Sequence, residues 1–100
     1  MSKAKNLIFQ DQRLVILTSL LECGYDANEN ILLDCLSLYG HRISQDLIRT
    51  HLLFLEEHGL ITIEKISDDV LWVAYLTRRG EDVAKGVARC DGVRKPHSNF

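Results

Sequence analysis

The chain has 100 residues, of which 46% are hydrophobic and 26% are charged, with one proline and six glycines. This length and composition predict a single soluble globular domain with a modest core. No apolar run approaches the roughly 20 residues that span a bilayer, and the N-terminus lacks the apolar region of a secretory signal, so we expect a cytoplasmic protein. The formal net charge of −2 supplies no general attraction to nucleic acid.

The cysteines and histidines are scattered along the chain and form no recognisable ligand set. Cys23, Cys35 and Cys90 include no CxxC pair, and the four histidines include no HExxH. Small core residues are the simpler interpretation of the cysteines, and a thiol switch or a soft-metal site is the alternative. There is no glycine-rich phosphate loop and no nucleophile motif. We therefore predict no enzymatic activity, no metal and no cofactor.

The N-terminal third predicts a polar arm over residues 1–8 and then a helix from about Phe9 to Cys23, with Gly24 as its stop. The apolar residues of this helix cover a broad arc, and Ile8 and Val15 fall outside it. Such breadth predicts that the helix is shared with a second subunit, in a homodimer. A merely exposed valine at Val15 is an equal alternative.

A second helix is predicted from Ala27 to about Tyr39, followed by a turn over residues 40–43. Asp26 and Glu29 have the spacing of a capping box at its start. Helical spacing gives this helix a buried face made of Ile31, Leu32, Cys35, Leu36 and Tyr39. Ile43 is expected to fill the core between this helix and the next.

The stretch from Ile43 to Ile66, ISQDLIRTHLLFLEEHGLITIEKI, predicts a third helix, a glycine stop and a strand. Ser44 is a good N-cap, and Gly59 can end the helix in the left-handed conformation. One side carries residues at helical spacing, namely Leu47, Ile48, His51, Leu52, Leu55 and His58. Strands over 60–66 and 70–76, joined by the polar residues 67–69, predict a hairpin.

The C-terminal part predicts a fourth helix and a tail. Thr77 can cap a helix from about Arg78 to Asp91, with Val83, Val87 and Cys90 on its inner side. Residues 92–100 show no periodicity and predict a flexible tail. The predicted domain is therefore 9–91, in an α+β fold that is mostly helical. Its predicted core residues are Leu17, Leu21, Leu36, Ile48, Leu52, Leu55, Leu60 and Leu76.

The third helix and its glycine stop resemble the recognition helix of bacterial ArsR- and MarR-type regulators, which often reads SQxxVSxHLxxLxxxGLI. Ile48 replaces the valine of that pattern, and the matching residues are Ser44, Gln45, His51, Leu52, Leu55, Gly59, Leu60 and Ile61. The run LTRRGEDVAKG from Leu76 to Gly86 resembles the LTxxGxxxA segment that closes winged-helix domains of the MarR and PadR groups. The chain is also similar to small uncharacterised winged-helix proteins of Mu-like prophages. The resemblance implies a winged helix-turn-helix with a three-helix core, a two-stranded hairpin as wing and a C-terminal helix.

This resemblance implies a DNA-binding transcriptional regulator that reads double-stranded DNA with the third helix, residues 44–58, and uses the hairpin 60–76 as its wing. Helical winding places Gln45, Arg49 and Thr50 outward. A glutamine can bind adenine, an arginine can bind guanine through two hydrogen bonds, and a threonine can meet a phosphate or a thymine methyl group. The predicted DNA-binding residues are Arg42, Ser44, Gln45, Arg49, Thr50 and Lys65.

The charge of the same surface supports a different function. Asp46, Glu56, Glu57 and the loop Asp68-Asp69 oppose phosphates, whose neutralisation supplies most non-specific DNA affinity. The alternative is a winged-helix protein–protein interaction module that binds a protein through Leu53, Phe54 and the acidic surface, without binding DNA. Both functions stay open at the level of the sequence.

Overall fold

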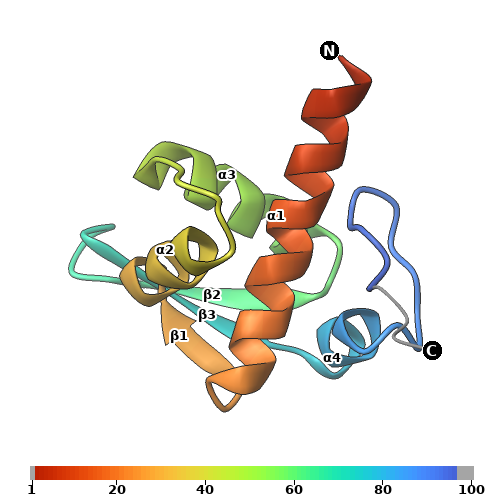
Figure 1. Cartoon of the computed structure of the whole chain (residues 1–100). Helices are drawn as coiled ribbons and strands as arrows, with labels where there is room; N and C mark the ends of the chain where they lie inside the picture. Colours follow the sequence, from red (N-terminus) through yellow and green to blue (C-terminus); the bar gives the residue numbers. More distant parts are fainter. Residues whose placement is uncertain (1, 97–100) are drawn as a thin grey trace.

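The computed structural model describes residues 2–96 and shows four helices around a three-stranded antiparallel sheet (Figure 1). The elements follow the order α1 (Lys3–Glu22), β1 (Asp26–Asn28), α2 (Glu29–Leu38), α3 (Gln45–Glu57), β2 (Ile61–Ile66), β3 (Leu71–Leu76) and α4 (Arg78–Ala84). This arrangement confirms an α+β fold and is compatible with a winged helix. Within residues 2–96, no helix is long and apolar enough to cross a membrane.

The sheet has the order β1-β3-β2, and one of its faces packs against the helices. Trp72 and Ala74 of β3 are buried on this face, whereas Thr62 and Tyr75, which are paired across β2 and β3, are exposed on the other. The predicted core is confirmed. Six of its residues are completely buried (Leu17, Leu36, Ile48, Leu52, Leu55 and Leu60), and Leu21 and Leu76 are partly buried against them.

The start of the second helix differs from the prediction, because residues 26–28 form a third strand. Asp26–Asn28 pairs antiparallel with residues 73–75 of β3, so the predicted two-stranded wing belongs to a three-stranded sheet. Asn28, not Asp26, caps α2, and its side chain accepts a hydrogen bond from the Ile31 amide. The partner strand lies almost fifty residues later in the chain, so no local pattern indicates this pairing.

The buried side of α2 is narrower than predicted. Leu32 and Leu36 are completely buried and Cys35 is half-buried, but Ile31 and Tyr39 are exposed. At about 100° per residue the predicted face spans about 140°, and Leu32 and Leu36 lie at one edge of it. Only that edge of the face is completely buried.

The first helix begins earlier than predicted and is buried more completely. In the predicted arm, residues 1–8, residues 3–8 instead belong to α1, because the Ser2 hydroxyl caps the helix by accepting a hydrogen bond from the Lys5 amide, and Met1 lies outside the described residues. Val15 is only 6% exposed, since α1 packs against α2, α4 and β3 of its own chain. The breadth of its apolar arc is thus used within one subunit. Dimerisation through α1 stays a prediction, and it rests on the exposed Leu7 and Ile8.

The fourth helix is shorter than predicted and ends at Ala84, not at Asp91. Gly86 follows with a φ of 80°, which a helix cannot accommodate, and Val87 is exposed instead of facing the core. The chain then turns back toward α1.

Residues 92–96 pack against α1 and do not form a flexible tail (Figure 1). The Arg94 amide donates a hydrogen bond to the Gln10 carbonyl, with N and O 3.1 Å apart, and Val93 is buried in the core. The Arg13 guanidinium donates to the Gly92 carbonyl at 2.9 Å. Residues 97–100 of the predicted tail lie outside the described residues.

Gly80 lies where α4 crosses the turn between α3 and β2. A Cβ at this position would overlap the Leu60 carbonyl oxygen and would lie 2.8 Å from Cδ1 of Leu76. The glycine of the LTxxGxxxA-like run therefore allows α4 to approach a neighbouring backbone closely. Thr77 caps this helix as predicted, with its side chain accepting a hydrogen bond from the Gly80 amide.

We expect Gly80→Ala to destabilise the domain by roughly 1–3 kcal/mol, because the added methyl group forces α4 away from Leu60. In an unconstrained helix the same change would stabilise by up to about 1 kcal/mol, so the sign of the effect is diagnostic. Chemical denaturation measures it, with Arg78→Ala at an exposed site of the same helix as the control. A Gly80→Ala protein as stable as the wild type would contradict the close approach.

Candidate nucleic-acid interface

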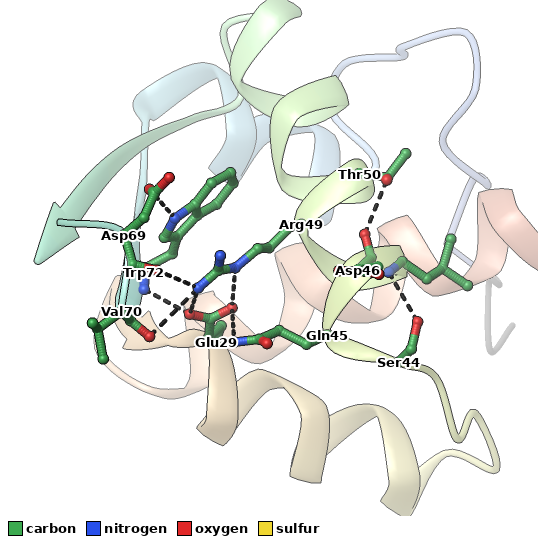
Figure 2. Close-up of polar contacts among 10 residues, drawn as sticks. Glu29, Ser44, Gln45, Asp46, Arg49, Thr50, Asp69, Val70 and Trp72 are labelled. Carbon is green, nitrogen blue, oxygen red and sulfur yellow. Dashed lines mark hydrogen bonds and ion pairs between the residues drawn. The ribbon is translucent and has the colours of Figure 1, made fainter.

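The third helix begins and ends where the sequence predicts. The Ser44 hydroxyl accepts a hydrogen bond from the Leu47 amide at 3.1 Å, and the helix ends before Gly59, whose φ is 76°. Ile43 in the preceding turn is partly buried against the core, also as predicted. Arg49, in the second turn of α3, reaches the hairpin loop, so a reading helix and a wing would share this side of the domain (Figure 2).

Arg49, the predicted guanine reader, is held by a buried carboxylate and keeps only 21% of its side chain exposed. Its Nε lies 2.8 Å from Oε1 of Glu29, and its Nη2 lies 2.8 Å from Oε2 of the same carboxylate (Figure 2). Nη2 also donates to the Asp69 carbonyl at 2.9 Å, and the guanidinium carbon lies 4.6 Å from the centre of the Trp72 ring. The prediction of an outward, unpartnered Arg49 is therefore wrong, since Nε and Nη2 of the fork that would bind guanine are occupied.

Glu29 binds the Arg49 side chain because the Glu29 carboxylate is completely buried and needs hydrogen-bond donors. Besides Arg49, the backbone amide of Trp72 donates to it at 2.7 Å, and the Gln45 amide nitrogen lies 3.4 Å away. The hydrogen bonds from Arg49 lower the pKa of Glu29 despite its burial, and the same hydrogen bonds raise the pKa of Arg49. One carboxylate thus connects α2, α3, β3 and the hairpin loop.

The hairpin loop is fixed to the same cluster through Trp72. The indole Nε1 donates to Oδ1 of Asp69 at 2.7 Å, and Nζ of Lys65 lies 4.7 Å from the indole ring centre. The structure therefore brings three of the predicted site residues together around Glu29 and Trp72, namely Gln45, Arg49 and Lys65. Glu29 and Trp72 themselves were missed, because the sequence separations of 20 and 43 residues leave no local signal.

The remaining predicted site residues have different surroundings. Ser44 uses its hydroxyl as the cap, and Oγ1 of Thr50 donates to the Asp46 carbonyl one turn earlier at 3.0 Å. Arg42 is exposed and makes no hydrogen bond, ion pair or ring contact with any residue from 2 to 96. None of these observations tests DNA binding.

The outward side of α3 is an acidic ridge with an apolar centre. Asp46, Thr50, Leu53 and Glu57 are exposed at i, i+4, i+7 and i+11, and we call them the α3 ridge. Leu53 is 45% exposed, and the two carboxylates give the ridge a formal charge of −2. The only Arg or Lys of α3 is Arg49, which is neutralised by Glu29.

A chain of polar contacts holds the back of α3 on α1 and on the turn before α3. Arginine is only a donor, so the contact of 3.1 Å from Nε of Arg13 makes Nδ1 of His51 an acceptor and leaves the proton on Nε2. That nitrogen lies 2.8 Å from Oε1 of Gln12, whose Nε2 lies 3.5 Å from Nδ1 of His41. Nε2 of His41 is in turn 2.7 Å from Oδ2 of Asp11. His51 is therefore a completely buried neutral group and not a residue at the border of the core.

Comparison with known proteins finds two uncharacterised relatives. An uncharacterised protein of Haemophilus influenzae is 61% identical over 75 residues, which are 75% of this chain and 72% of that protein. The uncharacterised protein gp26 of Escherichia phage Mu is 46% identical over 91 residues, which are 91% of this chain and 93% of gp26. The chain belongs to the gp26 family. No protein-family model and no solved structure matches it.

Membership of the gp26 family confirms the predicted relation to Mu-like phage proteins. It assigns no activity, because both relatives are uncharacterised. The function of this gp26-family chain therefore has to be argued from its own surface.

In this gp26-family chain, we expect Arg49→Ala to lower the melting temperature by on the order of 10 °C, because the Glu29 carboxylate would stay buried without its main partner. Arg49→Lys should recover only part of the loss, since an ammonium group cannot bind both carboxylate oxygens in the same planar geometry. Calorimetry measures the effect, and Arg42→Ala is the control at an exposed arginine. An Arg49→Ala protein that melts with the wild type would show that the Glu29–Arg49 pair does not form in solution.

Burial lowers the pKa of His51 from 6.5 to about 4, and the positive charge of Arg13 and then His41 add to this effect. Between these values the unfolded chain binds a proton that the folded chain does not. The unfolding free energy should therefore fall as the pH drops from 6.5 toward 4, by at most about 1.4 kcal/mol per pH unit.

Thermal melts between pH 7 and pH 5 test this linkage above the range in which Glu29 titrates. His51→Gln keeps a donor and an acceptor but cannot titrate, so its stability should lose most of this pH dependence. His58→Gln changes an exposed histidine and should keep the wild-type slope. An unchanged slope in His51→Gln would show that another group causes the acid destabilisation.

Proposed function

We propose that this gp26-family chain is a winged-helix protein–protein interaction module that presents the α3 ridge to a partner protein. The observation that carries the proposal is the bidentate Glu29–Arg49 contact, because it neutralises the one cation of α3. What the α3 ridge then offers to a partner is two carboxylates, a threonine and an apolar side chain.

This surface is poorly suited to a DNA groove and well suited to a protein. DNA affinity comes largely from neutralising phosphates, and Asp46, Glu57 and the nearby Asp68 would each oppose them. A protein interface, in contrast, combines an apolar centre with a polar rim, which is the arrangement of Leu53 between Asp46 and Glu57. Charge complementarity then favours a partner segment that carries basic residues around an apolar side chain.

A DNA-binding transcriptional regulator is the second candidate function. Two observations favour it. The first is the order of the elements, and the second is the hydrogen bond from Arg49 to the Asp69 carbonyl, which holds the hairpin loop on α3 and would preorganise a reading helix and its wing. In this form the chain would bind as a dimer through Arg42, Gln45, Thr50 and Lys65, with Arg49 in a positioning role. The resemblance to ArsR- and MarR-type regulators supports the same candidate.

Binding to random duplex DNA as a function of salt separates the two candidates. The interaction module should show no DNA binding even at low salt. The double substitution Asp46→Asn and Glu57→Gln should add little affinity for DNA. A regulator should bind with an affinity that falls steeply with salt, and the same two changes should strengthen it. Steep salt-dependent binding by the wild type would overturn the protein-binding proposal.

Selection from a random peptide library provides the positive test of the interaction module. We expect enrichment of peptides that combine Lys or Arg with an apolar residue, and a loss of their binding of at least about tenfold in Leu53→Glu. Val70→Glu introduces the same charge at an apolar residue that is 70% exposed in the hairpin loop and should bind normally. Enrichment that is insensitive to Leu53→Glu would place the binding surface elsewhere.

A further inference from the structure

A pocket lies between the segment that follows α4 and the helices α1 and α4. Its volume is about 580 Å³, which lies within the range of roughly 300–1,000 Å³ that small-molecule sites have. Gln10 of α1 and Val83 of α4 line it together with residues 88–96, the blue loop beside α1 in Figure 1. None of the four residues of the α3 ridge lines this pocket, so it is a separate surface of the domain.

The inner side of the pocket is apolar and belongs to the hydrophobic core. Val83 and Val93 are buried, and Ala88 is half-buried against the same core. The loop that carries Val93 is also fixed, because the Arg13 guanidinium donates a hydrogen bond to the Gly92 carbonyl at 2.9 Å. The apolar surface of the pocket is therefore formed before any ligand arrives, as in most small-molecule sites.

The outer side of the pocket is positively charged. The lining has one carboxylate, Asp91, and three cations, so its formal charge is +2; the cations are Arg89, Arg94 and Lys95. The chain as a whole has a formal net charge of −2. Positive charge is thus concentrated at this pocket against the balance of the protein.

Two of the three cations are available to a ligand. Nη1 of Arg94 lies 3.2 Å from Oδ1 of Asp11, so this guanidinium already has a carboxylate partner. Arg89 and Lys95 are exposed and make no hydrogen bond, ion pair or ring contact with any residue of the described range 2–96. Their positive charges therefore face the opening of an apolar pocket without a counter-charge from this part of the chain.

We propose that this pocket binds a small, water-soluble organic anion, in which an acidic oxygen group is attached to an apolar body. The acidic group pairs with Arg89 and Lys95, and the apolar body covers Val83 and Val93. An inorganic anion would use only the cations, and a neutral apolar molecule would use only the inner side. The inference does not depend on the α3 ridge or on its partner.

The expected affinity is modest, because each contribution is small by itself. Ion pairs at exposed side chains add little in water, and the apolar side of the pocket is short. A ligand of about twenty non-hydrogen atoms should therefore bind with a dissociation constant on the order of 0.1 mM. The diagnostic property is the requirement for both parts of the ligand.

The probe for this test is anilinonaphthalenesulfonate, an aromatic sulfonate whose fluorescence rises when it leaves water. Phenylnaphthylamine has a similar apolar body without the sulfonate, and inorganic sulfate has the charge without the apolar body. We expect the sulfonate probe to bind one site on the full chain and both comparison ligands to bind at least about tenfold more weakly. The near-UV circular dichroism of the protein must stay unchanged, because partly unfolded proteins also bind this probe.

Substitutions in the pocket separate its two sides. Arg89→Ala with Lys95→Ala should weaken binding of the sulfonate at least about tenfold and leave the weak binding of the amine unchanged. Ala88→Leu places a larger side chain in the pocket and should weaken the binding of both. Lys3→Ala with Lys5→Ala removes two exposed cations at the start of α1 and should bind the probe as the wild type does.

Three results would contradict the proposal. The first is sulfate binding as strong as that of the aromatic sulfonate, because charge alone would then explain it. The second is probe binding that neither Ala88→Leu nor the double change at Arg89 and Lys95 affects, in variants that melt with the wild type. The third is a gain of about tenfold or more in Phe100→Ala, a residue outside the described range, because the pocket would then belong to the protein's own chain.

Discussion

The buried carboxylate of Glu29 is the constraint on which the arrangement of this domain depends. A fully buried carboxylate is stable only if it is paired and hydrogen-bonded, and here the donors come from Arg49 on α3 and from the Trp72 amide on β3. Because Arg49 also reaches the Asp69 carbonyl, the hairpin loop is held by the same group. The relative positions of α2, α3 and the hairpin therefore follow from one charge on the first residue of α2.

The third helix could be predicted from the sequence because its signals are local. Ser44, the apolar positions Ile48, Leu52 and Leu55, and Gly59 all lie within one short stretch, and each acts on its neighbours. The same kind of reasoning gave most of the core, although Ile31, Tyr39 and Val87, which were also placed inward by helical spacing, are exposed.

The pairing of β1 and the contacts of Glu29 could not be predicted, because they depend on groups that are distant in the sequence. The spacing of Asp26 and Glu29 fits a capping box, but Glu29 turns inward to an arginine twenty residues later, and Asp26 joins a strand. Arg49 has the position of a base reader on a helical wheel, and a wheel contains no information about a buried carboxylate on another helix. The sequence thus placed Arg49 on the correct helix but could not show that its side chain pairs with Glu29.

The pairing of distant segments also has a consequence for how the chain acquires its structure. Strand β1 pairs with residues 73–75, and the Gln10 carbonyl of α1 accepts a hydrogen bond from the Arg94 amide. Contacts of such long sequence separation slow folding, because the intervening chain must be closed into loops first. During synthesis the first helix therefore lacks its contacts with β3, α4 and Arg94 until those later segments have left the ribosome.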